Sequence, residues 1–277
     1  MFERKVYADM IKWKNEYAPR YALFLKGARR VGKTTLAEKL GKEKYRSYIV
    51  VRFDQTTAEI EDLFVHGLRD LDYFFNTLQL EYETRLYPRE SLIILDEIQL
   101  FPPARQAIKT FVEDGRYDYL ETGSLAGIEK KSKKILIPSE EYPLDVLPMD
   151  FEEFLWAKGN DILMPTLREH FDSLKPMGTK HSSAMKTYRE YMIVGGMPQA
   201  VESYLAGNNF ADIDQVKRQI IQLYEDDFRK IDPSGRISSM YHAIPAQLAK
   251  DARKYRINSA IGKRGNTRAE ELLYELI

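Results

Sequence analysis

Residues 27–34 of this chain have the sequence GARRVGKT, and no other segment restricts the fold as much. They fit the pattern Gly-x-x-x-x-Gly-Lys-[Ser/Thr], in which backbone N–H groups close around phosphate oxygens and a helix N-terminus adds positive charge. The apolar run 21–25 before the segment predicts a buried strand, and residues 35–40 after it predict a helix. Strand, glycine loop and helix in this order favour a phosphate-binding loop over the ordinary glycine turn that also precedes many helices.

Two residues at the end of this loop have a defined chemistry if the phosphate belongs to a nucleotide. Lys33 would reach the β- and γ-phosphates, and the hydroxyl of Thr34 would be a ligand for Mg²⁺. Arg29 and Arg30, inside the loop, either contact phosphate or face solvent. The residues expected to bind the nucleotide are Gly27, Ala28, Arg29, Arg30, Val31, Gly32, Lys33, Thr34 and Thr35.

An acidic pair, Asp96 and Glu97, follows the near-continuous apolar run 91–95. Such a run suits a central parallel strand that is buried on both faces, and ligands of open α/β sheets bind at the carboxyl ends of these strands. Asp96 would hold Mg²⁺ through water, and Glu97 would orient and polarise an attacking water. Alone, the pair is equally consistent with an exposed turn; with the loop upstream it indicates the hydrolytic half of the site.

A third strand is predicted at residues 117–124, which end in the small hydroxyl residues Thr122 and Ser124. Either hydroxyl would contact the γ-phosphate or the attacking water, although Thr-Gly-Ser is also a common loop sequence. The expected catalytic residues are Glu97, Lys33, Thr122 and Ser124, and the expected metal ligands are Thr34 and Asp96.

The rest of the pattern predicts a doubly wound α/β fold. Residues 5–17 predict a helix, 48–53 a second strand, and 58–86 two further helices. Strands and helices that alternate along the chain form a parallel sheet with helices on both faces. After Pro148 the strand signals end, and helices are expected at 151–158, 183–194, 198–205 and 210–229.

Charge and cysteine content narrow the class of protein. Lys and Arg number 42, as do Asp and Glu, so net charge gives no argument for nucleic acid or an anionic membrane. The chain has no cysteine, which excludes disulfides and thiolate chemistry and fits a reducing compartment. The charged N-terminus lacks a signal-peptide pattern, and no apolar run approaches the length of a membrane span. We therefore expect a cytoplasmic protein with no membrane contact.

The three motifs GARRVGKT, LIILDEIQ and YDYLETGS, in this order, resemble the AAA-type ATPases of the AAA+ superfamily. More narrowly, the chain is similar to a prokaryotic group of AAA-family ATPases with an uncharacterised C-terminal region. The segments that carry the narrower resemblance are 137–138, 142–156, 191–201, 224–230 and 244–250. The resemblance implies ATP and Mg²⁺ as ligands, a P-loop NTPase core at residues 1–150 and a helical lid at 151–235. A helical bundle with no part in the chemistry is the alternative for the second region.

The last region, 236–277, is expected to begin a winged-helix-like C-terminal domain, as the resemblance implies. Within it, residues 250–268 contain seven Lys and Arg side chains and a single acid. Such a segment would contact DNA phosphates, or the domain would serve as a protein–protein surface. The capping-box pattern at 267–270 opens a helix whose apolar face has no evident partner, so we expect the chain to be a truncated piece of a longer protein.

The leading hypothesis is a Mg²⁺-dependent ATPase that acts as a molecular switch or motor and is slow in isolation. The alternatives are a nucleotide-gated DNA-binding protein and an assembly protein that binds ATP with little turnover. Many such enzymes need an arginine from a neighbouring subunit, which would make a homo-oligomer or protein partner necessary. Arg105 and Arg116 qualify for that part only by their order in the chain. Kinases and GTPases are weaker readings, because the chain has neither a guanine-specificity signature nor a recognisable second-substrate pocket.

Overall fold

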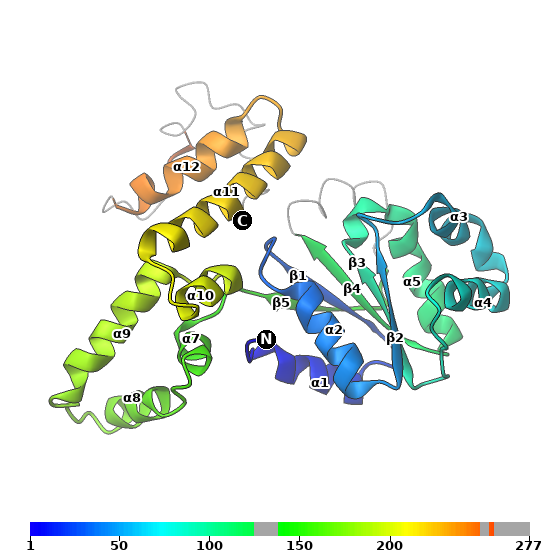
Figure 1. The fold of residues 1–277 in the computed structure, drawn as a ribbon. Helices are drawn as coiled ribbons and strands as arrows, with labels where there is room; N and C mark the ends of the chain where they lie inside the picture. Colours follow the sequence, from blue (N-terminus) through cyan, green and yellow to red (C-terminus); the bar gives the residue numbers. More distant parts are fainter. Residues whose placement is uncertain (125–137, 250–254, 258–277) are drawn as a thin grey trace.

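The computed structural model describes residues 1–124, 138–249 and 255–257. It has two parts, a sheet with helices on both faces and an arm of helices that stands beside the sheet (Figure 1). The first part consists of α1 (Val6–Glu16), β1 (Ala22–Gly27), α2 (Lys33–Lys44), β2 (Ser47–Arg52), α3 (Ala58–His66), α4 (Leu71–Glu81), β3 (Ser91–Asp96), α5 (Pro102–Asp114), β4 (Asp118–Ser124) and β5 (Glu141–Val146). The arm consists of α7 (Phe151–Ala157), α8 (Leu163–Asp172), α9 (Lys180–Val194), α10 (Pro198–Leu205), α11 (Phe210–Ile231) and α12 (Arg236–Leu248).

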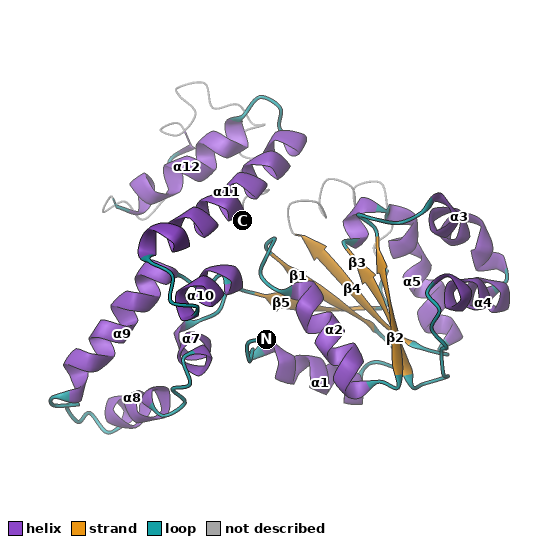
Figure 2. Cartoon of the chain, in the orientation of Figure 1, coloured by secondary structure: helices purple, strands orange, loops and turns teal. Residues whose placement is uncertain are grey.

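The sheet has five strands in the order β2-β3-β4-β1-β5, and every neighbouring pair is parallel. Figure 2 shows these strands as one layer between helices. The predicted doubly wound parallel α/β fold is therefore confirmed. Because β1, β3 and β4 are adjacent, the phosphate-binding pattern, the acidic pair and the Thr-Gly-Ser segment all come to the same edge of the sheet.

Strand β5 was not among the predicted strands. It lies at the edge of the sheet beside β1, and only Val146 of its residues is buried. An edge position tolerates Pro143, which cannot donate a hydrogen bond to a neighbouring strand. Two acidic residues and a proline leave this segment without the apolar run by which the buried strands are recognised.

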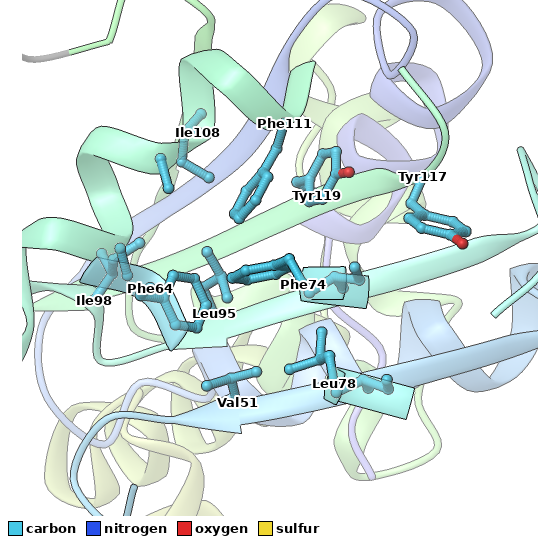
Figure 3. Close-up of a cluster of buried hydrophobic side chains, with 14 of the residues drawn as sticks. Val51, Phe64, Phe74, Leu78, Leu95, Ile98, Ile108, Phe111, Tyr117 and Tyr119 are labelled. Carbon is cyan, nitrogen blue, oxygen red and sulfur yellow. The ribbon is translucent and has the colours of Figure 1, made fainter. Parts of the chain in front are cut away.

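The two faces of the sheet bury different sets of side chains. On one face, Phe64 of α3, Phe74 of α4 and Phe111 of α5 pack together over Val51 and Leu95 of the strands (Figure 3). On the other face, a second cluster is formed by Met10, Trp13, Leu23, Leu25, Leu36, Ala37, Leu40, Leu92, Ile94 and Leu120, among others. Residues of β3 and β4 are buried throughout, as expected for strands covered on both sides.

Within the described residues, helices are found at all the predicted positions, with ends shifted by a few residues. The predicted helix at 35–40 begins at Lys33, and that at 183–194 begins at Lys180. Helix α8 was not predicted. Pro165 falls in its first turn and none of its residues is buried, so its sequence has neither a clear start nor a core-facing stripe.

Several predictions lie partly or wholly outside the described residues. The expected start of a winged-helix-like domain, 236–277, is described at α12 and at 255–257, where Tyr255 and Ile257 pack near Phe228 of α11. Most of the basic segment 250–268 and the helix expected after 267 lie outside them. The boundaries 1–150, 151–235 and 236–277 stay predictions. Among the described helices, none is long and apolar enough to cross a bilayer.

Candidate functional site

The loop between β1 and α2 curls around the side chain of its own lysine. Gly32, at the N-cap of α2, has φ of 100°, a backbone conformation that residues other than glycine rarely adopt. The Lys33 ammonium, in the first turn of α2, donates to the carbonyl oxygens of Gly27 at 3.0 Å and Ala28 at 2.9 Å. The glycine pattern therefore places one cation against two backbone carbonyl oxygens of the loop at a helix N-terminus.

Burial and nearby charges act on Lys33 in opposite directions. The residue is 5% exposed, and burial lowers the pKa of the ammonium below its usual value. The carboxylates of Glu97 and Asp96 raise the pKa in part, while Arg29 lowers it further. Two acids and two bases thus meet within one small region, as is common where charged ligands bind.

Asp96 connects the glycine loop to the ends of two central strands. Its Oδ1 accepts a hydrogen bond from the Thr34 hydroxyl at 2.8 Å and another from the Thr122 hydroxyl at 2.6 Å. The oxygen of the Thr122 hydroxyl also accepts from the backbone N–H of Glu97 at 3.1 Å. Residues from α2, β3 and β4 therefore form one hydrogen-bonded chain, and Thr122 is fully buried beneath it.

Glu97 is held in an unusual backbone conformation at the end of β3. Its φ is 55° and its ψ is 44°, in the left-handed region that costs a residue other than glycine roughly 1–3 kcal/mol. The hydrogen bond from its N–H to Thr122 helps to hold this conformation. Its side chain accepts a hydrogen bond from the amide of Gln99, a residue that sequence reasoning did not single out. The position of Gln99, two residues after the acidic pair, is the signal that could have found it.

These residues open onto a cleft of about 690 Å³ between the sheet and the helical arm. Of the residues predicted to form the site, the cleft is lined by Arg29, Arg30, Gly32, Lys33, Thr34, Thr35, Asp96 and Glu97. The remaining ones lie around it. Val31 is fully buried, Gly27 and Ala28 bind Lys33, and Ser124 pairs with Gly27 in the β1–β4 register. The three sequence motifs are thus brought together.

The opposite wall of the cleft comes from α10, which belongs to the expected helical lid but none of whose residues was predicted for the site. Pro198, Gln199 and Glu202 of this helix line the cleft. The start of α10 is placed by Gly196, whose carbonyl accepts from the Met149 N–H at 2.7 Å. A Cβ at Gly196 would lie 2.1 Å from the Met149 carbonyl oxygen, so only glycine permits this approach. The Gly-Gly-Met-Pro segment at 195–198 therefore positions one wall of the cleft.

Arg4, before α1, connects the glycine loop to the helical arm, and no pattern in the sequence points to it. Its Nη1 donates to the Val31 carbonyl at 3.0 Å, its Nε to Glu153 at 3.2 Å, and its Nη2 to the Leu147 carbonyl. The side chains of Arg4 and Glu153 are both 6% exposed. One guanidinium thus binds the glycine loop, the chain after β5 and the first turn of α7.

The two arginines considered for a neighbouring site are held within the α/β part. Arg105 is buried, forms two hydrogen bonds of 2.7 Å with Glu141, and lies over the ring of Phe24. Arg116 forms ion pairs with Asp72 and Asp114. Arg105 in particular exposes only 8% of its side chain.

Comparison with known families gives two matches along the chain. A family model described as "AAA domain" matches residues 19–155, and one described as "Domain of unknown function (DUF8612)" matches residues 185–274. Among the curated proteins no relative matches. The glycine loop, the acidic pair and Thr122 all fall within the first match, and α10 and α11 fall within the second.

Several solved structures resemble the chain at a distance. They include AMPPCP-bound DnaA from Aquifex aeolicus, with 14% identity, a TM-score of 0.39, and 97% of this chain and 75% of that one covered. The RuvB Holliday junction branch migration motor of Thermotoga maritima has 13% identity and a TM-score of 0.41, covering 99% and 88%. PCH-2 of C. elegans has 12% identity and a TM-score of 0.40, covering 79% and 65%.

The family assignment agrees with the order of the strands and with the motifs that the sheet brings together. The chain contains an AAA domain, the domain of AAA+ P-loop ATPases, at residues 19–155, and the domain of unknown function follows it at residues 185–274.

Proposed function

We propose that this protein binds ATP with Mg²⁺ and hydrolyses it to ADP and phosphate, as a molecular switch or motor of the cytoplasm. The observation that carries the proposal is the hydrogen-bonded chain Thr34–Asp96–Thr122–Glu97. It joins the glycine loop to a carboxylate suited to a metal and to a second carboxylate suited to a water. A loop that only bound phosphate would need neither acid.

The metal-binding part of the proposal is supported by the chemistry of the oxygens. The Thr34 hydroxyl and the Asp96 carboxylate lie 2.8 Å apart, and both are ligands that Mg²⁺ prefers. Within the described ranges, no group of three or more His, Cys, Asp or Glu side chains could hold a metal by itself. Thr34 and Asp96 would therefore hold Mg²⁺ jointly with phosphate oxygens. When bound, Mg²⁺ neutralises charge that develops on the phosphates.

The hydrolytic part is assigned to Glu97. Its carboxylate would accept a hydrogen bond from the attacking water and orient that water toward the γ-phosphorus. The new bond joins the water oxygen to phosphorus as the bond to the β–γ bridging oxygen breaks, releasing ADP and phosphate. Gln99 and the Thr122 hydroxyl would fix the side chain and the backbone of Glu97 during this step. Lys33 would bind the β- and γ-phosphates.

The test is phosphate release from ATP and from GTP with Mg²⁺, measured on wild type, Lys33→Ala and Glu97→Gln. We expect Glu97→Gln to retain ATP binding and to lose roughly 100-fold or more in kcat, because a positioned base contributes that much. Lys33→Ala should lose ATP binding. Matched controls are Glu113→Gln and Lys109→Ala, an exposed pair on α5, which should behave as wild type. Turnover by Glu97→Gln within about twofold of wild type would contradict the assignment.

A further inference from the structure

The glycine loop is held from outside by helix α11, which lies in the region of unknown function. The Tyr224 hydroxyl donates to the Arg29 carbonyl at 2.9 Å. One turn later, Asp227 accepts from Nη1 of Arg29, with 3.0 and 3.2 Å to its two oxygens. In Figure 1, the arm that contains α11 stands beside the end of the sheet at which β1 leads into α2. The two contacts join segments that are 195 and 198 residues apart in the sequence.

The two contacts differ in how easily they exchange. Burial raises the pKa of Tyr224 to about 12, so its hydroxyl stays a donor at neutral pH. The Arg29 and Asp227 side chains are 38% and 22% exposed, and an ion pair of this kind is weak because water and salt screen it. The backbone of the loop is thus fixed, while the guanidinium can change partner at little cost.

Arg29 also lines the cleft that contains Lys33 and Thr34. Arginine binds phosphate and carboxylate oxygens in the same fork-like geometry, so an anion in the cleft competes with Asp227 for the same donors. ATP carries one more negative charge than ADP at neutral pH, and a more negative ligand competes better. Asp227 has a second cation at hand, since Lys230 lies 3.2 Å from its Oδ1.

We propose that Arg29 and Asp227 form a specificity-determining pair, in which Asp227 holds Arg29 until the triphosphate takes it. This inference rests on the proposed function and gives the region of unknown function a part in it. Exchange of Arg29 from Asp227 to phosphate releases the charged half of the contact between α11 and the loop. The Tyr224 half remains, so the arm stays attached while its contact with the site changes.

The test compares dissociation constants for the non-hydrolysable ATP analogue AMPPCP and for ADP, both with Mg²⁺. Asp227→Asn keeps the size of the side chain and removes its charge. We expect it to tighten AMPPCP binding by about three- to fivefold, the upper part of the range for a surface ion pair, and ADP binding by less than about twofold. The matched control is Asp226→Asn, the neighbouring acid on α11, which accepts from Gln222 instead. It should leave both constants unchanged.

A double-mutant cycle separates this effect from a general loosening of the arm. In an Arg29→Gln background, Asp227→Asn should have no further effect on the ratio of the two constants. Equal changes for AMPPCP and ADP, or an effect that survives in the Arg29→Gln background, would overturn the pair. If wild type hydrolyses ATP and the ratio does not move, only the pair fails. If wild type binds neither nucleotide, the proposed function and the pair fail together.

Discussion

The two walls of the cleft are built in different ways. One wall consists of the ends of β1, β3 and β4, whose residues are buried almost throughout and whose chemistry lies in three short segments. The other wall consists of α10. This helix is positioned by individual contacts, among them the approach of Gly196 to Met149. The first wall holds the charged and hydroxyl groups, and we call it the chemical wall. The second wall sets the shape of the cleft, and its Gly-Gly-Met-Pro segment positions the backbone without supplying a reactive group.

Arg4 offers the sharpest test of how the sheet and the arm are joined, because it binds both the glycine loop and α7 of the arm. Arg4→Ala would leave Glu153 buried without its guanidinium, although two backbone N–H groups still donate to that carboxylate. We expect the free energy of unfolding to fall by about 3 kcal/mol, the lower end of the cost of breaking a buried ion pair. Urea denaturation measures this loss, with Arg20→Ala on the exposed surface after α1 as the control.

Arg4→Lys is a second variant for that experiment. A lysine keeps the charge but cannot reach three acceptors in different directions, so it should recover only part of the stability. If Arg4→Ala were as stable as Arg20→Ala, the contacts of Arg4 would have no part in holding α7 against the glycine loop.

Thr122 tests the chemical wall. Thr122→Val keeps the shape of the side chain and removes the hydroxyl that joins Asp96 to the N–H of Glu97. We expect kcat for ATP to fall roughly 100-fold, as when one positioned hydrogen-bonding group is removed from an active site. The dissociation constant for ATP should change by less than about threefold, because the glycine loop is untouched. Steady-state kinetics and equilibrium binding measure the two quantities.

Thr122→Ser is the matched variant, since it restores the hydroxyl without the methyl group. It should regain most of the lost turnover. Equal kcat values for the valine and serine variants would show that the hydroxyl has no part in positioning Glu97.

The same division explains how much could be predicted from the sequence. The chemical wall was predictable because each motif is contiguous and ends a buried strand, so its place at the edge of the sheet follows from topology alone. Strand β5 was not predictable, because Pro143 interrupts the apolar pattern by which a strand is recognised. The position of α10 was not predictable either, because it depends on the backbone contact at Gly196. Arg4 was beyond prediction, since its partners are 27, 143 and 149 residues away.

The smallest expected effect on stability comes from the contact between α8, at the outer end of the arm, and α7. Helix α8 buries none of its residues, but Arg168 binds Glu152 of α7 with distances of 2.9 and 2.6 Å. Hydrogen bonds from Arg168 and then from Lys5 lower the pKa of the Glu152 carboxyl below its usual 4.5. The unfolded chain therefore takes up this proton first as the pH falls. The contribution to stability is present in full above pH 4.5 and is lost as the pH falls through the folded pKa.

Glu152→Gln should therefore lower the free energy of unfolding by about 1 kcal/mol at neutral pH, since more than half of the Arg168 side chain is exposed and solvent screens the pair. Below the folded pKa, wild type and variant should be equally stable. Urea denaturation across this pH range measures the difference, with Glu169→Gln on α8 as the control. A difference that persisted unchanged into acid would mean that Glu152 acts through packing, and that the arm is positioned by shape alone, without charge.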